Sequence, residues 1–212
     1  MTRAIVFDFD GVILDSVNVK TNAFAKMFED YGDAIKAKVV AHHLANGGIS
    51  RFEKFRYYYK EFLGIELSEE QLKQLGEKFS ELVYREVVNA PAIPGAVEFL
   101  EKQKLHTANY VASGTPEEEI IKIIEEKKLA KYFKKVYGSP KTKKEIIEEI
   151  LHENNYERSD LVFIGDALTD YNAARNAGVN FIGIKSNAIQ FPDEVQSFNN
   201  FYEVEKAWQL IE

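Results

Sequence analysis

Residues 6–12, which read VFDFDGV, are the stretch around which the rest of the chain is organised. The run over residues 3–7 favours a buried strand, and Gly11 interrupts it. We therefore expect Asp8 and Asp10 at the carboxyl end of this strand, where open α/β sheets bind their ligands. Residues two apart in an extended segment point to the same side, so these carboxylates repel each other unless a cation intervenes or one keeps its proton. Taken alone, the motif is also typical of a turn that caps a helix.

The composition narrows the class of protein. A length of 212 residues suits one domain or a core with an insertion, and 45% apolar content is ordinary for a globular protein. A net charge of −7 without a basic block argues against a nucleic-acid partner, and the lack of cysteine excludes thiolate chemistry. With no transmembrane stretch and no apolar leader, we expect a cytoplasmic enzyme that does not bind membranes.

The sequence pattern of residues 13–89 differs from that of the rest of the chain. This segment contains no second apolar, strand-like run that ends in a charged residue. Four helices are predicted here, over residues 18–31, 34–44, 51–63 and 68–88. In the third of them, Phe52, Phe55, Tyr59 and Phe62 recur at helical spacing, which indicates the core of a helix bundle rather than a cofactor site.

After Pro94 and Gly95 the pattern becomes an alternation of strands and helices. Strands are predicted over residues 109–113, 135–137, 160–165 and 180–184, and helices over residues 96–104, 116–128, 142–153 and 170–177. This alternation predicts an α/β fold with a parallel sheet covered on both faces. We therefore expect a core made of residues 1–14 and 91–212. The helical insertion, residues 15–90, should lie above the carboxyl edge of the sheet.

The second predicted strand ends in Ser113, Gly114 and Thr115. Thr115 and Glu118 have the spacing of a capping box, with Pro116 at the first helical position. The alternative is that the Ser113 hydroxyl and the following amides also form an anion site at a helix N-terminus.

Three lysines crowd the start of a later helix, at positions 141, 143 and 144. The helix dipole disfavours cations there, and departures from local rules are typical of functional sites. One of these lysines could balance the acidic cluster and hold a phosphate, and we favour Lys143 over Lys141. The alternative is that all three are solvated.

A second acidic pair follows the fourth predicted strand, at Asp166 and Asp170. Either residue could simply start a helix. Carboxylates that converge from two strands would destabilise one another without a cation, however, and hard oxygen ligands without Cys or His suit Mg²⁺.

These four motifs, in this order, resemble those of the haloacid dehalogenase superfamily. Each motif alone is weak evidence for this superfamily, but all four motifs in this order are specific to it. The helical insertion resembles the C1 cap of the phosphoglycolate phosphatase and β-phosphoglucomutase-like branch, so the resemblance covers the whole chain. It implies a Rossmann-like parallel sheet of strand order 5-4-1-2-3 with an inserted α-helical cap that opens and closes.

The resemblance also implies roles for the motif residues. Asp8 would be the nucleophile, and Asp10 the general acid and then the general base. Ser113 and Gly114 would hold the phosphoryl oxygens, with a lysine to neutralise them. Relatives often follow this lysine with proline, which none of the three lysines does, so the choice among them stays open.

Mg²⁺ is the cofactor that the resemblance implies. Its ligands would be an oxygen of Asp8, the backbone carbonyl of Asp10 and the carboxylate of Asp166, while Asp170 would support its water shell. Mutases of this branch carry a cap histidine where this chain has Lys20, which argues against a mutase.

Arg51 lies in a segment that resembles the part of the mutase cap where an arginine binds a second phosphate. It could bind substrate at its far end or be a solvated residue of a first helical turn. His42 and His43 could line the same opening, although the interpretation as surface histidines is favoured.

The sequence therefore predicts a Mg²⁺-dependent phosphatase that hydrolyses a small phosphorylated metabolite through an aspartyl-phosphate. A phosphomutase is the first alternative, and a binding module that keeps the fold without the chemistry is the second. The protein is expected to be a monomer or a homodimer.

Overall fold

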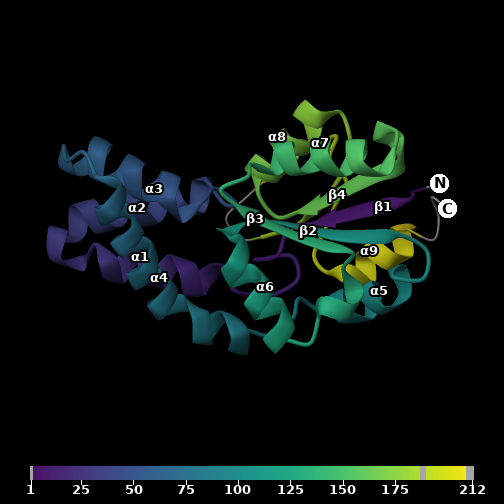
Figure 1. The fold of residues 1–212 in the computed structure, drawn as a ribbon, viewed down its shortest axis with the longest axis horizontal. Coiled ribbons are helices and arrows are strands. Elements are labelled where there is room, and N and C mark those ends of the chain that lie inside the picture. Colours follow the sequence, from purple (N-terminus) through teal and green to yellow (C-terminus); the bar gives the residue numbers. More distant parts are fainter. Residues whose placement is uncertain (1, 187–189, 209–212) are drawn as a thin grey trace.

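A parallel sheet forms the centre of the computed structural model, which describes residues 2–186 and 190–208 (Figure 1). Its strands are β1 (Ala4–Phe7), β2 (Ala108–Pro116), β3 (Lys135–Ser139), β4 (Leu161–Gly165), β5 (Asn180–Ile184) and β6 (Ser197–Phe198). They lie in the order β3-β2-β1-β4-β5-β6, and every neighbouring pair is parallel. The predicted order is thus confirmed, and β6 is an edge strand that the sequence patterns did not indicate.

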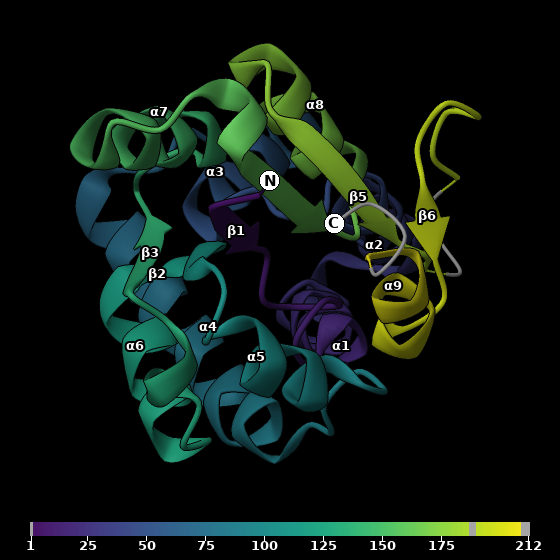
Figure 2. The ribbon, with the colours of Figure 1, turned by 90° about the vertical axis from the view of Figure 1, so that its right-hand side faces the viewer.

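Helices cover both faces of the sheet (Figure 2). One face carries α7 (Lys143–Asn154) and α8 (Leu168–Ala177), and the other carries α5 (Ala96–Gln103), α6 (Glu117–Glu126) and α9 (Phe201–Trp208). Short 3-10 turns occupy η3 (Ala130–Tyr132) and η4 (Arg158–Asp160). Strand β1 is buried along its whole length, because Ala4 and Val6 pack under α7 and α8 while Ile5 and Phe7 pack on the opposite side.

The segment between β1 and α5 is helical, as predicted. It comprises α1 (Val17–Met27), the 3-10 turn η1 (Glu29–Tyr31), α2 (Asp33–Ala45), α3 (Arg51–Tyr57), the π-helix η2 (Tyr58–Leu63) and α4 (Glu69–Asn89). We call helices α1 to α4 the cap. They pack on one another around an aromatic core that contains Phe24, Phe28, Phe55, Tyr58 and Phe79, so the predicted bundle core is confirmed for Phe55.

The cap stands beyond one end of the sheet, next to the carboxyl ends of the strands (Figure 1). The residue limits predicted for the cap and the core, 15–90 against 1–14 and 91–212, stay predictions. Within the described residues, no helix is both long and apolar enough to cross a membrane.

One local prediction is wrong. Strand β2 continues through Thr115 to Pro116, so Thr115 does not cap α6, and Pro116 is the N-cap residue instead. The Thr115 side chain contacts Lys20 and Asp10 across the site. These contacts to charged groups compete with local capping, and a local spacing rule does not include them.

Candidate active site

Four segments that are distant in sequence meet at the carboxyl edge of the sheet. Asp8 follows β1 directly, Ser113 lies near the end of β2, and Asp166 follows β4. Lys143 is the first residue of α7. The parallel register of β1 with β2 and β4 brings these strand ends side by side, as is usual for ligand sites in open α/β sheets.

Asp8 lies within a buried charge cluster. Its Oδ1 is 3.0 Å from Nζ of Lys143, and the same ammonium is 2.5 Å from Oδ1 of Asp170. Burial raises the pKa of Asp8 to about 7, although Lys143 opposes this shift. Burial lowers the pKa of Lys143, but the Asp170 and Asp8 carboxylates outweigh it, so that this pKa lies above its ordinary value. Lys143 is therefore a cation in direct contact with Asp8, the predicted nucleophile.

The other two lysines of the crowded helix start lie outside this cluster. Lys141 is exposed and pairs with Glu149, and Lys144 is exposed as well. Thr142 caps α7 through its hydroxyl, which accepts from the amide of Glu145 at 3.3 Å. Lys143, which follows this N-cap residue, is the lysine of the three whose side chain is buried and contacts Asp8.

Three carboxylates form a possible metal site. Asp8, Asp166 and Asp170 each offer an oxygen, and these oxygens lie within 4.8 Å of one another. Burial, followed by the negative charges of Asp8 and Asp170, raises the pKa of Asp166 well above its ordinary value. Gly11 has a φ of +84°, and a Cβ there would collide with the Asp166 carboxylate. A side chain at position 11 would thus close the space beside these oxygens.

The side chain of Asp10 is held outside this group of three. Ser16 donates to its Oδ1 at 2.7 Å, and Lys20 of α1 forms an ion pair with its Oδ2. Lys20 also donates to Oγ1 of Thr115 at 2.7 Å, and so it links the cap to β2. Burial raises the pKa of Asp10, but Lys20 and then Ser16 outweigh it, so the net shift is downward. Asp10 is ionised in this state.

Ser113 and Gly114 border the site from β2. The Ser113 hydroxyl accepts from the amide of Thr115 at 3.1 Å and retains its own proton for donation. Gly114 packs against the cap, because a Cβ there would collide with the carbonyl oxygen of Gly48. Gly48, at a φ of +76°, lies in turn over Lys143 and Asp170, and Thr169 donates to the carbonyl of Gly47. The cap is therefore closed on the core.

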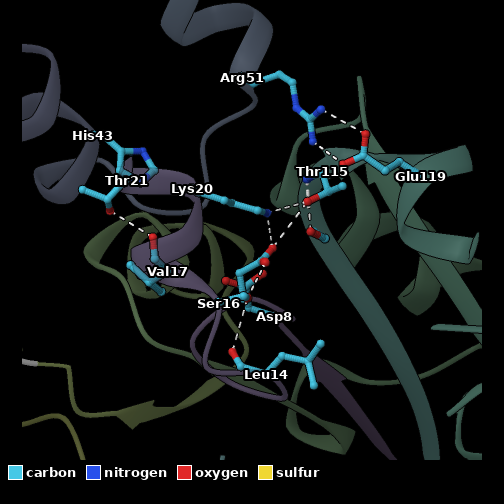
Figure 3. A network of polar contacts seen from close by, with 12 residues as sticks. Asp8, Leu14, Ser16, Val17, Lys20, Thr21, His43, Arg51, Thr115 and Glu119 are labelled. Carbon is cyan, nitrogen blue, oxygen red and sulfur yellow. Dashed lines mark hydrogen bonds and ion pairs between the residues drawn. The ribbon is translucent and has the colours of Figure 1, made fainter. Parts of the chain in front are cut away.

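Arg51 joins the cap to the core through a second contact. Its Nη2 is 2.5 Å from Oε1 of Glu119 on α6, and its Nη1 is 3.0 Å from Oε2 (Figure 3). Ser80 of α4 accepts from the same guanidinium at 2.6 Å. Arg51 lines the cavity beside these groups, but its charge is already neutralised by a carboxylate of this chain, and its role in binding substrate stays a prediction.

A partly open cavity of about 70 Å³ lies between the core and the cap at this site. Asp8, Asp10 and Asp166 line it from the core, and Lys20, Arg51 and Lys54 line it from the cap. His43 also lines it and is buried, so the interpretation of His43 as a surface histidine is wrong. Lys20 and Lys54 were not among the predicted site residues. The spacing of Lys54, three residues after Arg51 on one helix face, could have indicated it.

Comparison with known sequences identifies the family to which this chain belongs. The sequence model of haloacid dehalogenase-like hydrolases matches residues 5–184, which include every predicted site residue. The chain belongs to the haloacid dehalogenase-like hydrolase family. The family resemblance predicted from the four motifs is confirmed.

Individual members of this family are similar along most of the chain. The phosphorylated carbohydrates phosphatase of Thermotoga maritima is 26% identical over 186 residues, which cover 85% of this chain and 83% of that protein. The phosphoglycolate phosphatase of Aliivibrio fischeri is 23% identical over 185 residues, or 83% of this chain and 81% of the relative. A hydrolase from Pseudomonas syringae has the same fold, with a TM-score of 0.80 over 99% of both chains and 19% identity.

Proposed function

We propose that this family member is a cytoplasmic, Mg²⁺-dependent phosphatase that hydrolyses a small phosphorylated metabolite through an aspartyl-phosphate. The observation that carries the proposal is the contact of 3.0 Å between Asp8 and Lys143 beside the acidic cluster. A carboxylate nucleophile needs a nearby cation to approach a negatively charged phosphoryl group. The naming of relatives as phosphatases supports the same reaction.

In the first half of the reaction, Asp8 attacks the phosphorus atom, and the bond from phosphorus to the leaving oxygen breaks. Asp10 gives its proton to that oxygen, so the alcohol leaves uncharged. Asp10 must therefore be protonated at this stage, which requires release of its ion pair with Lys20. Ser113 and Gly114 hold the phosphoryl oxygens, and Lys143 offsets their charge.

In the second half, Asp10 takes a proton from a water molecule that attacks the same phosphorus atom. The acyl phosphate bond breaks, Asp8 is released as a carboxylate, and inorganic phosphate leaves. The lowered pKa of Asp10 suits this step, because an ionised carboxylate can accept the proton.

The acidic cluster fits a divalent cation. Three buried carboxylates within 4.8 Å would repel each other, and Lys143 compensates only part of their charge. Oxygen ligands without nitrogen or sulfur suit Mg²⁺. Asp8 and Asp166 would hold it, with the Asp10 carbonyl as the further predicted ligand and Asp170 in support. When bound, it would neutralise charge on the transferring phosphoryl group.

An aryl phosphate assay tests this function. Purified protein with Mg²⁺ should release inorganic phosphate, and acid quenching during turnover of a radiolabelled substrate should leave label on the protein. Absence of both products with aryl and alkyl phosphates would refute the proposal.

A phosphomutase of the β-phosphoglucomutase type is the alternative from the sequence. Lys20 stands where those mutases carry a histidine, which argues against this reaction. Stoichiometric phosphate release without a hexose bisphosphate would exclude the mutase, and a strict requirement for the bisphosphate would establish it.

A further inference from the structure

A second cavity lies between the cap and the core, next to the one described above, which we call the first cavity. The second cavity has a volume of about 300 Å³, compared with about 70 Å³ for the first, and Gly48 and Gly114 line both. These two glycines pack closely, because a Cβ on Gly114 would lie 2.4 Å from the carbonyl oxygen of Gly48. The contact between them therefore forms part of the wall between the two cavities.

The groups that the proposed reaction requires are divided between these cavities. Asp8 and Asp10 line the first cavity, where the alcohol leaves. Ser113 and Lys143, which hold the phosphoryl group in the proposed reaction, line the second. Nζ of Lys143 is 3.0 Å from Oδ1 of Asp8, so this side chain reaches from the nucleophile to the wall of the second cavity. A phosphate released from Asp8 would therefore already lie beside the second cavity.

The lining of the second cavity offers hydrogen-bond donors to an anion. Asn172 and Asn176 lie one turn apart on α8 and are both exposed, and Lys141 lines the cavity at the start of α7. Side-chain amides and ammonium groups can donate to phosphate oxygens. The carboxylate in this lining is that of Glu53 in the cap, which is exposed and can turn to solvent.

One buried hydroxyl in the lining has no partner. Ser139 ends β3 and is 5% exposed, and its Oγ makes no hydrogen bond to any residue that the structure describes. A buried hydroxyl without a partner is costly, so its presence indicates that a ligand or water supplies the bond. Ser139 lies three residues before Thr142, the N-cap of the 12-residue helix α7, and the dipole of this helix favours an anion there.

We propose that the second cavity is the route by which inorganic phosphate leaves the active site while the cap stays closed. This inference rests on the proposed phosphatase function. Exit through the first cavity would require the cap to open, because the ion pairs of Lys20 with Asp10 and of Arg51 with Glu119 join the cap to the core beside it. Phosphate is smaller than any of its esters, so a passage that admits the product can exclude the substrate.

Single-turnover kinetics test this route. Protein in excess over radiolabelled nitrophenyl phosphate, with Mg²⁺, gives three signals, which are the release of nitrophenol, the loss of acid-quenched phosphoenzyme and the appearance of free phosphate at a fluorescent phosphate sensor. Asn172→Trp places a large side chain at an exposed position that lines the second cavity. The rate constant for the appearance of free phosphate should fall by about 10-fold or more, because release becomes slower than chemistry. The other two rate constants should equal those of the wild type.

The matched control is Asn180→Trp, which changes an exposed asparagine at the first residue of β5, outside the cavity lining. In this variant, free phosphate should appear at the wild-type rate. If Asn172→Trp does not fold, Asn176→Trp fills the same cavity from the next turn of α8 and should give the same delay.

Free phosphate that follows the loss of phosphoenzyme without delay in a folded, filled variant would overturn the exit route and leave the phosphatase function intact. Equal slowing in Asn180→Trp would overturn it too, since the effect would not depend on the cavity. Slower release of nitrophenol in the filled variants would instead show that the cavity admits substrate, which contradicts the proposal. Failure of the wild type to release phosphate from any ester would refute the proposed function itself.

Discussion

Arg51 of the cap and Glu119 of the core form a bidentate ion pair that is almost fully buried, with side-chain exposures of 4% and 10%. The pair bridges α3 and α6 on the border of the cavity at the candidate active site. Together with the contact of Thr169 with Gly47, it holds the cap against the sheet edge. Removal of one partner leaves the other as a buried, unpaired charge.

We therefore expect Glu119→Gln to destabilise the protein by about 2–4 kcal/mol, since breaking a buried pair is much more costly than breaking an exposed one. Urea denaturation provides the measurement. Glu69→Gln is the control, because its pair with Arg56 is exposed and should contribute less than about 1 kcal/mol. An equal loss of unfolding free energy in the two variants would show that burial does not make the pair of Arg51 with Glu119 more stabilising than the exposed pair.

Asp8→Asn should lower kcat at least about 1,000-fold, because the amide is not a nucleophile toward phosphorus. Phosphate release from an aryl phosphate is measured, and circular dichroism checks that the variant is folded. Asp15→Asn changes an exposed aspartate of the same segment and should retain full activity. Turnover by folded Asp8→Asn near the wild-type rate would exclude Asp8 as the nucleophile.

Lys143→Ala should abolish most of the activity and also lower stability by about 3–5 kcal/mol, because it leaves Asp8 and Asp170 buried without their cation. Steady-state kinetics and thermal unfolding are the measurements. The adjacent Lys144→Ala removes an exposed lysine and should change neither quantity. Loss of activity in Lys144→Ala together with full activity in Lys143→Ala would instead assign to Lys144 the role of neutralising the phosphoryl group.

Mg²⁺ should stabilise the protein as well as activate it. At a concentration 100 times its Kd, the expected gain is about 3 kcal/mol, and chelation with EDTA should abolish activity. Asp166→Asn should reduce the shift in Tm that Mg²⁺ causes. It should leave the metal-free Tm equal or higher, since one of three crowded carboxylates is gone.

The exposed Asp30→Asn serves as the control for this experiment and should show the wild-type response to Mg²⁺. A full Tm shift in Asp166→Asn would mean that the cation binds elsewhere.

The stability of the protein should depend on pH through Lys54. Its pKa falls from 10.5 to about 7 on folding, so between these values the unfolded chain binds a proton that the folded chain does not. The free energy of unfolding of the wild type, relative to Lys54→Met, should therefore rise from pH 7 toward pH 10, by roughly 4 kcal/mol at most. Urea titrations at pH 7, 8 and 9 measure this difference. A difference that stays constant with pH would show that Lys54 is not desolvated in the folded protein.

Much of the fold follows from local patterns in the sequence. Buried parallel strands are short apolar runs, and each ends at a recognisable polar residue, which is why β1, β4 and the positions of Asp8 and Asp166 could be predicted. The regular alternation of strands and helices after Gly95 predicted that the strands of the sheet are parallel. The edge strand β6 has only two residues, too few for a period to be detected.

The sequence by itself thus determined the α/β class, the helical insertion and the set of acidic and hydroxyl residues at the strand ends, because periodicity and spacing are properties of neighbouring residues. Only the tertiary structure decided which charge meets which. It selected Lys143 from three lysines, paired Arg51 with Glu119 and left Lys54 without a carboxylate. Such pairings join residues that are distant in sequence, such as Asp8 with Lys143 within the core and Arg51 with Glu119 between the cap and the core, and no local pattern specifies them.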